Sequence, residues 1–268
     1  MLSNSTLILE SLKDKKVFNL VECAMHNGDF KKSPAIAGFL TTSVLNKNYS
    51  SDQDLLKIIN NVVGDRPLTL GQLTSEEKVR RRRTQVAELL RGKKIGSYLD
   101  YGCGNGKITR AIVETIKPEK SFGTDIMDQR NTNEECNFDF QWRGSLPEKS
   151  FDLITCFTVL HHIDNIAAEL RCMKDLLKDS GVLMIREFDA ATDEDKLFNY
   201  VMDEIYYKGY MNNYTVPIEM NYYSKETWMS LFSNLGFDVV SRGGALKFKS
   251  DEGNPYKPFY TILRKKRK

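Results

Sequence analysis

The sequence predicts an α/β fold with a mainly parallel sheet, and three observations support this prediction. Between residues 96 and 187, short apolar runs alternate with stretches of helical periodicity. A glycine-rich turn stands between the first of these runs and the helical stretch that follows it. The chain has 268 residues, enough to bury most of the apolar surface in one large domain, or in one domain with an appendage. Alternation of strands and helices implies βαβ units, whose strands lie parallel in one sheet.

The expected elements follow one another in a regular order along this part of the chain. They are strands at 97–101, 121–124, 138–142, 151–157 and 182–186, with helices at 108–116 and 167–177. Near the end, Ser224 is expected to cap a helix that Gly236 terminates, because large apolar residues recur there at helical spacing. Two further strands are expected at 237–240 and 259–263.

A helical region is expected at the start of the chain, over residues 1–75. Its apolar residues recur at helical spacing, and turn signals such as Asn27-Gly28 interrupt them. A longer helix is expected at 75–91. It begins the α/β domain, which we place at 76–268.

An insert at residues 188–221 interrupts the α/β pattern and is rich in aromatic side chains. These are Phe198, Tyr200, Tyr206, Tyr207, Tyr210 and Tyr214. An insert at this place can form a lid over a substrate, and its aromatics suit an apolar or aromatic molecule as well as stacked bases. The alternative is that they pack the insert onto the domain.

The composition is that of an ordinary globular protein. Charged residues make up 28% and the hydrophobic set 41%, which excludes disordered, collagen-like and low-complexity classes. Lysine and arginine total 39 against 36 acids, so a preference for nucleic acid would have to come from local clusters. No run approaches the roughly 18 apolar residues of a membrane span, and the first residues lack the pattern of a signal peptide. The five cysteines form no Cys-x-x-Cys pair, so we expect free thiols in a reducing, cytoplasmic compartment.

The most specific feature of the sequence is the glycine-rich turn at 102–106, Gly-Cys-Gly-Asn-Gly. It follows a predicted strand that carries Asp100 and opens a helix, so the backbone there can turn tightly and approach a ligand closely. A second acid, Asp125, ends the next strand, where a carboxylate can hold two ribose hydroxyls. The spacing differs from the Gly-x-Gly-x-x-Gly of dinucleotide sites, and Asp100 is unfavourable beside a pyrophosphate but favourable beside a cationic amino-acid group. A tight turn without a ligand is the alternative.

This segment resembles the first motif of class I S-adenosylmethionine-dependent methyltransferases. The resemblance continues, in order, at 125, 146–147, 151–154, 159–163, 181–185, 223–227 and 235–237. The last two segments resemble the methyltransferase type 11, or ubiquinone-biosynthesis-like, branch. The resemblance implies S-adenosyl-L-methionine as the cofactor. It also implies a Rossmann-like sheet of seven mostly parallel strands, with helices on both faces and an antiparallel last strand.

The resemblance also implies which residues hold the cofactor. They are Asp100, Gly102, Cys103, Gly104, Gly106, Asp125, Ile126, Phe157 and Thr158, and Ser145 is added as a candidate for the reason that follows. One position departs from the family's pattern, because no acid stands just before Leu146-Pro147 to meet the adenine amino group. Ser145, Gln141 or a backbone carbonyl would have to accept that hydrogen bond.

Two of the three histidines, His161 and His162, follow the strand expected at 151–157. They stand at the carboxyl edge of the sheet, where ligands bind in open α/β folds. A neutral imidazole there can accept a proton or position a methyl acceptor, and His162 is favoured because the resemblance is strongest at that position. The alternative is that the pair packs or caps the loop. Metal binding by the pair is not expected, since no third ligand has suitable spacing.

Four consecutive arginines, at 80–83, stand on the helix that precedes the first expected strand. Adjacent residues on a helix lie about 100° apart, so the four cannot share one face. Arg82 and Arg83 flank the predicted apolar stripe, whereas Arg80 and Arg81 point away from it. We expect Arg82 or Arg83 to reach the cofactor carboxylate, with the other two arginines facing solvent or a polyanion.

The methyl acceptor stays open at the level of the sequence. RNA is narrowly favoured, because basic clusters at 80–83, 93–94 and 264–268 can neutralise phosphates. A small-molecule acceptor is supported by the branch resemblance and by the aromatic insert. A non-catalytic, cofactor-binding partner subunit is the third hypothesis. Arg186 and Glu187 end the strand at 182–186 or follow it, and they either face the substrate or form an ordinary ion pair.

Overall fold

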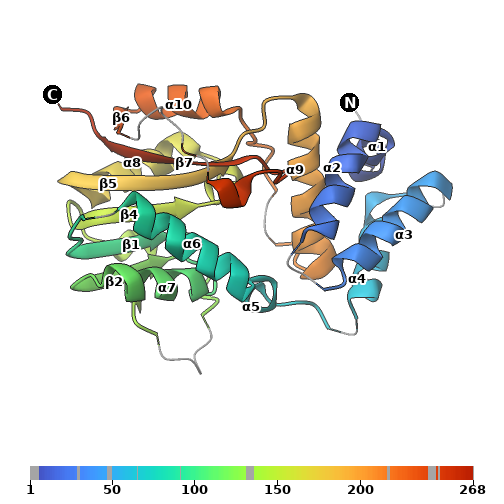
Figure 1. Cartoon of the computed structure of the whole chain (residues 1–268), viewed down its shortest axis with the longest axis horizontal. Coiled ribbons are helices and arrows are strands. Elements are labelled where there is room, and N and C mark those ends of the chain that lie inside the picture. The colour runs from blue at the N-terminus through green and yellow to red at the C-terminus, as the bar shows by residue number, and fades with distance from the viewer. Residues whose placement is uncertain are drawn as a thin grey trace.

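The computed structural model describes residues 6–28, 31–46, 50–64, 66–90, 92–130, 136–215, 218–240, 246 and 248–267. Its centre is a seven-stranded sheet in the order β3-β2-β1-β4-β5-β7-β6 (Figure 1). The strands are β1 (Ser97–Tyr101), β2 (Lys120–Thr124), β3 (Asp139–Phe140), β4 (Phe151–Phe157), β5 (Leu177–Phe188), β6 (Phe237–Val239) and β7 (Pro258–Lys265). Neighbours run parallel except β7, which is antiparallel to β5 and β6. The predicted Rossmann-like sheet with an antiparallel last strand is therefore confirmed.

Helices cover both faces of this sheet. On one face lie α6 (Glu76–Leu89) and α7 (Lys107–Ile116), and on the other lie α8 (Ile166–Leu176) and α10 (Lys225–Asn234). Each pair buries apolar side chains against the strands, among them Val86 and Ile112 on the first face, and Leu170, Trp228 and Phe232 on the second. Burial on both faces explains why the central strands read as continuous apolar runs in the sequence.

The helix ends follow local signals in the sequence. Ser75 and Ser224 cap α6 and α10, because each side chain accepts a hydrogen bond from a backbone amide of the first turn. Gly236 follows α10 with a φ of +80°, which is the left-handed conformation that glycine adopts at a helix end. Residue 91, the end predicted for the helix now defined as α6, lies outside the described residues.

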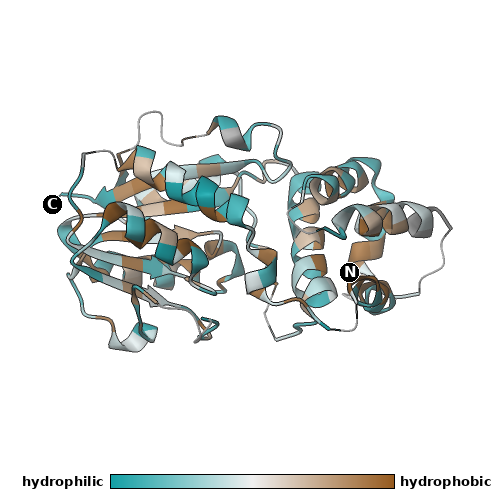
Figure 2. Ribbon diagram, turned by 60° about the horizontal axis from the view of Figure 1, so that its bottom comes forward, coloured by the Kyte–Doolittle hydropathy of each residue, from teal (hydrophilic) through white to brown (hydrophobic). Residues whose placement is uncertain are grey.

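A separate group of helices lies beside the sheet (Figures 1 and 2). It contains α1 (Leu7–Lys13), α2 (Lys15–His26), α3 (Ser33–Asn46) and α4 (Asp52–Val63), together with α9 (Asp193–Glu204) and the π-helix η3 (Ile205–Tyr210) from the insert. These elements share one hydrophobic core, which includes Ile8, Val21, Leu55, Phe198 and Ile205. The aromatic insert therefore packs with the N-terminal helices, and we call this group the helical cap.

The described residues contain no helix that is both long and apolar enough to cross a membrane. All five cysteines are free thiols. A cytoplasmic location stays a prediction of the sequence.

Candidate functional site

The carboxyl ends of β1, β2, β4 and β5 meet at one edge of the sheet, because these strands run parallel. This edge faces the helical cap, since the chain passes from the end of β5 into α9 (Figure 1). In open α/β sheets, ligands bind at such an edge. We call the loops at 102–106, 125–127 and 158–162 the strand-end site.

Three glycines with left-handed backbone conformations build the first loop of this site. Gly102, Gly104 and Gly106 have φ angles of +85°, +52° and +76°. A Cβ atom at Gly102 would overlap the Val159 side chain, and one at Gly104 would lie 2.8 Å from Leu70 Cδ2. Backbone conformation and space both require glycine here, so the sequence alone fixes the path of this turn.

The short helix α5 (Leu70–Leu73) lies against the glycine turn. Lys107 Nζ donates to the carbonyl oxygen of Gly71 at 3.0 Å, and Asn105 Nδ2 donates to Thr74 Oγ1 at 3.4 Å. The segment that leads from the N-terminal helices into α6 thus covers the turn.

Asp100 is buried beneath the turn. Its Oδ2 accepts a hydrogen bond from Thr109 Oγ1 at 2.5 Å, and its Oδ1 accepts one from Thr155 Oγ1 at 2.7 Å. Burial raises the pKa of Asp100 to about 6, although the two hydroxyl groups oppose this shift. Burial also raises the pKa of the Cys103 thiol, which therefore stays protonated. Asp100 joins β1, α7 and β4, and it supplies negative charge close to the turn.

Asp125 stands at the end of β2, where the sequence places a ribose-binding acid. Its Oδ2 accepts a hydrogen bond from the Gly104 amide at 2.8 Å, and its Oδ1 accepts one from the Ile126 amide at 2.7 Å. Ile126 itself is apolar yet 73% exposed. Trp142 follows β3, the strand that pairs with β2, and is 57% exposed. Exposed apolar side chains beside a carboxylate fit a ligand that combines a flat ring with hydroxyl groups.

Ser145 lies in the short 3₁₀ helix η1 (Arg143–Ser145) and is exposed. Its hydroxyl donates to the carbonyl oxygen of Trp142 at 2.7 Å and keeps lone pairs that can accept a further hydrogen bond. The backbone amide of Gln141 donates to the carbonyl oxygen of Gly123 at 2.9 Å, which ties this segment to β2. Ser145, Gln141 and a backbone carbonyl therefore all stay candidate acceptors for an adenine amino group.

Thr158 has a strained backbone at the end of β4. Its φ is +56°, a conformation that β-branched residues rarely adopt. Its amide donates to the carbonyl oxygen of Arg186 at 2.8 Å, which ties the end of β4 to β5. Phe157 packs edge-on against Tyr260, with ring centroids 5.7 Å apart. These contacts fix residues 157–158, which lead into the loop that carries His161 and His162.

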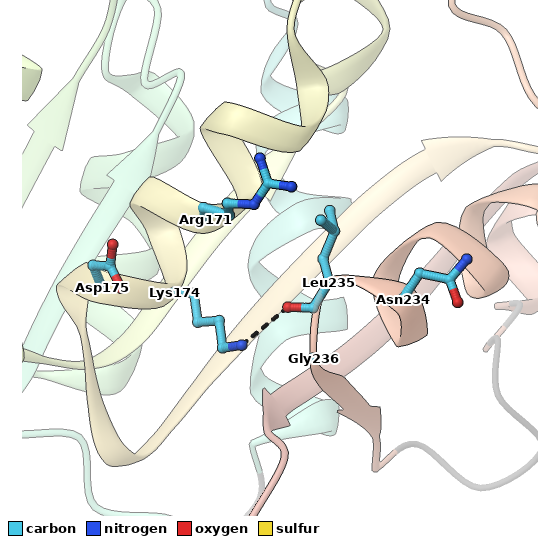
Figure 3. A pocket seen from close by; sticks show the side chains of 6 residues that line it. All are labelled: Arg171, Lys174, Asp175, Asn234, Leu235 and Gly236. Carbon is cyan, nitrogen blue, oxygen red and sulfur yellow. Dashed lines mark hydrogen bonds between the residues drawn. The ribbon is translucent and has the colours of Figure 1, made fainter.

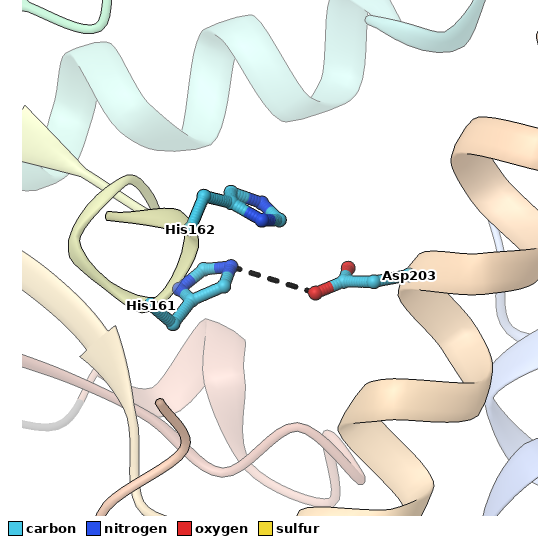
Figure 4. Close-up of side chains that lie close together, drawn as sticks. All are labelled: His161, His162 and Asp203. Carbon is cyan, nitrogen blue, oxygen red and sulfur yellow. Dashed lines mark ion pairs between the residues drawn. The ribbon is translucent and has the colours of Figure 1, made fainter. Parts of the chain in front are cut away.

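His161 is buried between two carboxylates. Its Nδ1 lies 2.6 Å from Glu187 Oε2, and its Nε2 lies 3.6 Å from Asp203 Oδ2 (Figure 4). Burial opposes protonation, but the Glu187 carboxylate outweighs it and raises the pKa of His161. Glu187 Oε1 also accepts hydrogen bonds from the amides of Val159 and Leu160. One buried acid thus holds both the imidazole and the loop that carries it.

His162 has a different environment from its neighbour. Burial, and then the adjacent His161, lower the pKa of His162 well below its usual range, so its ring stays neutral. Its Nε2 lies 3.5 Å from the Tyr207 hydroxyl, and within the described part of the chain its buried Nδ1 has no hydrogen-bond partner. A neutral imidazole with an unpaired nitrogen can accept a proton from a bound molecule.

The helical cap supplies two of the groups around the histidines. Asp203 comes from α9 and Tyr207 from η3, and the Tyr222 hydroxyl donates to Asp203 Oδ2 at 2.6 Å. The cap therefore closes over the histidine loop through side chains of the insert.

The same geometry bears on metal binding. His161, His162 and Asp203 offer ligand atoms within 4.8 Å of one another, so the fold supplies a third ligand that spacing along the chain did not reveal (Figure 4). The raised pKa of His161 means that its imidazole holds its proton more strongly, and metal binding requires the neutral form. A site without a metal stays our prediction.

The arginine run divides differently from the expectation. Arg82 is 7% exposed and donates through Nη1 to Gln85 Oε1 at 2.9 Å, whereas Arg83 is exposed. The prediction that both flank the inward stripe was wrong for Arg83, because the buried face of α6 is formed by Arg82, Gln85 and Val86. Arg83 therefore lies on the outer surface of α6, away from the sheet, and Arg82 is the better candidate for the cofactor carboxylate.

A hollow of about 460 Å³ lies between α8 and α10 (Figure 3). It is lined by Arg171, Lys174, Asp175, Asn234, Leu235 and Gly236. These residues precede β5 and β6, so the hollow lies at the amino edge of the sheet, opposite the strand-end site. It contains none of the residues that the sequence assigned to a site.

Comparisons with known proteins agree with this geometry. Residues 74–242 match the family described as "Methyltransferase domain". The chain is 28% identical over 127 residues to protein 235L of Invertebrate iridescent virus 6, whose name describes it as a methyltransferase. That match covers 45% of this chain and 48% of the viral protein, so the chain spans about half the length of the curated relative it matches.

Solved structures share the fold at low sequence identity. One is the 1,6-didemethyltoxoflavin-N1-methyltransferase of Burkholderia thailandensis with bound 1,6-didemethyltoxoflavin and S-adenosylhomocysteine, which is 16% identical with a TM-score of 0.52. The match covers 72% of this chain and 80% of that one. Another is the Haloferax volcanii methyltransferase in complex with the Trm112 activator, at 15% identity, a TM-score of 0.50, and coverage of 72% and 92%.

The match over 74–242 and the strand-end site together define the chain as a member of the methyltransferase-domain family. The ubiquinone-biosynthesis-like branch within the class I enzymes stays a prediction. The match begins just before α6 and ends just after β6, so it leaves the N-terminal helices of the cap outside the family's common core.

Several residues of the site were missed in the sequence. Trp142 could have been found as a large aromatic at the end of a predicted strand. Asp203 had no local signal, because it stands among other acids on an amphipathic helix. Tyr222 was not considered, and Tyr207 was one aromatic of the insert without an assigned place. Only the packing of the insert against the histidine loop brings these groups together.

Proposed function

We propose that this chain is an S-adenosylmethionine-dependent methyltransferase whose acceptor is a small molecule held between the strand ends and the helical cap. The observation that carries this proposal is the contact between the cap and the histidine loop. Asp203 and Tyr207, both from the insert, lie 3.6 Å and 3.5 Å from the imidazole nitrogens of His161 and His162. A cap that reaches the reacting region in this way encloses a small acceptor and excludes water.

The residues present fit the cofactor. The glycine turn has the close backbone approach that only glycine permits, Asp125 offers a carboxylate for ribose hydroxyls, and Ile126 and Trp142 offer apolar surface for a purine. Phe157 and Thr158 would line the methyl-donor side, and buried Arg82 stays the candidate for the cofactor carboxylate. The bound cofactor would supply an electrophilic methyl group on a sulfonium.

The chain's own part in the reaction is to position the acceptor and to manage its proton. Methyl transfer is an in-line displacement, so holding the nucleophile in line with the methyl group gives most of the rate enhancement. His162 is neutral and has an unpaired nitrogen, so it can take the proton of an acceptor hydroxyl or amine. His161, held by Glu187, positions the loop rather than the substrate.

The placement of the basic clusters supports a small acceptor over RNA. Lys93 and Lys94 precede β1. Arg264 lies opposite Val182 in the middle of β5, and because β7 is antiparallel to β5 the basic residues after Arg264 run toward the start of β5, so both clusters stand toward the amino edge of the sheet. Arg264 is six positions from the β5 end at Phe188, or about 20 Å along the strand.

Ion pairs reduce the free positive charge of these clusters further. Arg80 pairs with Glu77 at 2.7 Å, Lys94 with Glu119 at 3.5 Å, and Lys265 with Asp179 at 3.5 Å. Lys268 of the basic tail lies outside the described residues. RNA as the acceptor stays the competing prediction.

The test is transfer of a labelled methyl group from S-adenosylmethionine into separated metabolite, RNA and protein pools of a cell extract. We expect label in the metabolite pool with the wild-type chain and much less with Asp125→Asn when the cofactor is below saturation. Label confined to RNA would overturn the small-acceptor proposal. Binding of the cofactor without transfer to any pool would support the partner-subunit hypothesis instead.

A further inference from the structure

Arg186 is a buried cation that forms no ion pair with any residue that the structure describes. The residue is 4% exposed, and its Nε atom is buried without a hydrogen-bond acceptor. Across the described residues, no carboxylate forms an ion pair with its guanidinium group. The carboxylates of Asp251 and Glu187 favour its charge but form no ion pair with it, whereas burial and Arg82 oppose it. A buried guanidinium without a direct anionic partner is unfavourable, so this one is expected to meet an anion from outside the chain.

Two aromatic rings contact the guanidinium group of Arg186, but they do not accept the hydrogen bonds that it can donate. Its Cζ lies 5.4 Å from the ring centroid of Phe188 and 5.9 Å from that of Tyr260. Aromatic faces stabilise a guanidinium but leave its N–H groups available for hydrogen bonds. Asp251 Oδ2 accepts from Gln85 Nε2 at 3.0 Å, and Asp251 Oδ1 has no hydrogen-bond partner among the described residues, Arg186 included. Burial, and then the nearby Arg82, lower the pKa of Arg186 to about 10, so it stays charged at neutral pH.

The position of Arg186 assigns it to the acceptor rather than to the cofactor. It stands two residues before the end of β5, which lies on one side of β4, whereas the glycine turn and Asp125 follow β1 and β2 on the other side. Its carbonyl oxygen accepts a hydrogen bond from the Thr158 amide, so Arg186 lies beside the end of β4. Phe157 and Phe188, both half-buried, provide apolar surface next to it.

We propose that Arg186 binds a carboxylate of the methyl acceptor, which is therefore a small carboxylic acid whose apolar body lies against Phe157 and Phe188. The planar edge of a guanidinium matches a carboxylate with two parallel hydrogen bonds. This assignment rests on the proposed small-molecule function and names the substrate class within it.

The first experiment uses the wild-type chain saturated with S-adenosylhomocysteine, so that the cofactor's own carboxylate already occupies its place. Isothermal titration calorimetry then compares benzoate with benzamide, which has the same shape but no charge. We expect benzamide to bind roughly tenfold more weakly than benzoate, or worse. Equal affinity of the two compounds would overturn the proposal without reference to any variant.

The second experiment uses Arg186→Met, with Arg80→Met on the exposed face of α6 as the matched control. We expect Arg186→Met to lose benzoate binding by roughly tenfold or more while its affinity for S-adenosylhomocysteine changes by less than about twofold. Because it removes a buried charge that has no ion-pair partner among the described residues, it should also raise the melting temperature of the ligand-free protein. A lower melting temperature with unchanged benzoate binding would show a purely structural role, and equal losses for benzoate and S-adenosylhomocysteine would assign Arg186 to the cofactor.

The two proposals fail in different ways. If the acceptor is RNA, labelled methyl groups enter RNA while benzoate still binds more tightly than benzamide. If the carboxylate assignment is wrong, methyl transfer into metabolites persists while benzoate and benzamide bind alike.

Discussion

The two halves of the strand-end site are built by different means. On the side of β1 and β2, backbone conformation dominates, because three glycines with positive φ fix the turn and Asp125 accepts from backbone amides. On the side of β4 and β5, buried side chains from distant segments dominate, with Glu187 and Asp203 placed around His161. The geometry of the first half depends mainly on a short stretch of sequence, whereas the second half also depends on the packing of the helical cap, which supplies Asp203. This difference agrees with the proposed division of the site into a cofactor half and an acceptor half.

The strongest test of the backbone half is Gly102→Ala. The new Cβ would overlap Val159, and φ of +85° is unfavourable for alanine, so we expect a loss on the order of 3 kcal/mol in unfolding free energy and loss of measurable cofactor binding. Chemical denaturation and calorimetry measure both. Gly38→Ala in α3 is the control, since it has open space around it, and it should leave both quantities unchanged. Normal cofactor binding by Gly102→Ala would show that the turn is not held as described.

The strongest test of the side-chain half is Glu187→Gln. The amide loses the charge that holds His161 and cannot accept all three hydrogen bonds that reach Glu187, so we expect a loss of about 1 to 3 kcal/mol in unfolding free energy. Methyl transfer should fall further than stability explains, because the histidine loop loses its anchor. Glu114→Gln, on the exposed face of α7, should behave as the wild type. Equal activity of the two variants would argue against a positioning role for Glu187.

These two variants show what the sequence could and could not predict. The order of strands and helices, the glycine turn and Asp125 were predictable, because they depend on periodicity and on residues that only certain backbone paths accept. The placement of Asp203 and Tyr207 was not, since it depends on how α9 and η3 pack with α1 to α4 in one core. The error at Arg83 has a similar cause, because the direction of the buried stripe on α6 was set by Gln85 and its partners rather than by apolar residues alone.

A pH titration of stability sharpens the comparison further. The pKa of His161 is raised in the folded chain, so protonation stabilises the fold at pH values below the ordinary pKa of about 6.5. That contribution is lost as the pH rises through the folded pKa. The difference in unfolding free energy between the wild type and His161→Gln should therefore be largest near pH 6 and shrink toward alkaline pH. His26→Gln, at the exposed end of α2, should stay within about 0.5 kcal/mol of the wild type at each pH.

The smallest effect is expected where the sequence-based prediction was wrong. Arg83→Ala removes an exposed side chain and should change the affinity for S-adenosylhomocysteine by less than about twofold. Arg82→Ala removes a buried guanidinium that bonds Gln85 and lies near Arg186, and if Arg82 binds the cofactor carboxylate it should weaken that affinity roughly tenfold. Calorimetry on the two neighbouring variants compares them directly. The reverse order would restore Arg83 as the cofactor residue.

The central claim is that one half of the site holds the cofactor while the other acts on the acceptor. The most direct measurement combines S-adenosylhomocysteine affinity with labelled methyl transfer for Asp125→Asn and His162→Gln. We predict that Asp125→Asn weakens the affinity by roughly tenfold or more, whereas His162→Gln keeps it within about twofold and lowers the transfer rate roughly a hundredfold. Transfer at the wild-type rate by His162→Gln, or a loss of cofactor affinity equal to that of Asp125→Asn, would contradict this account.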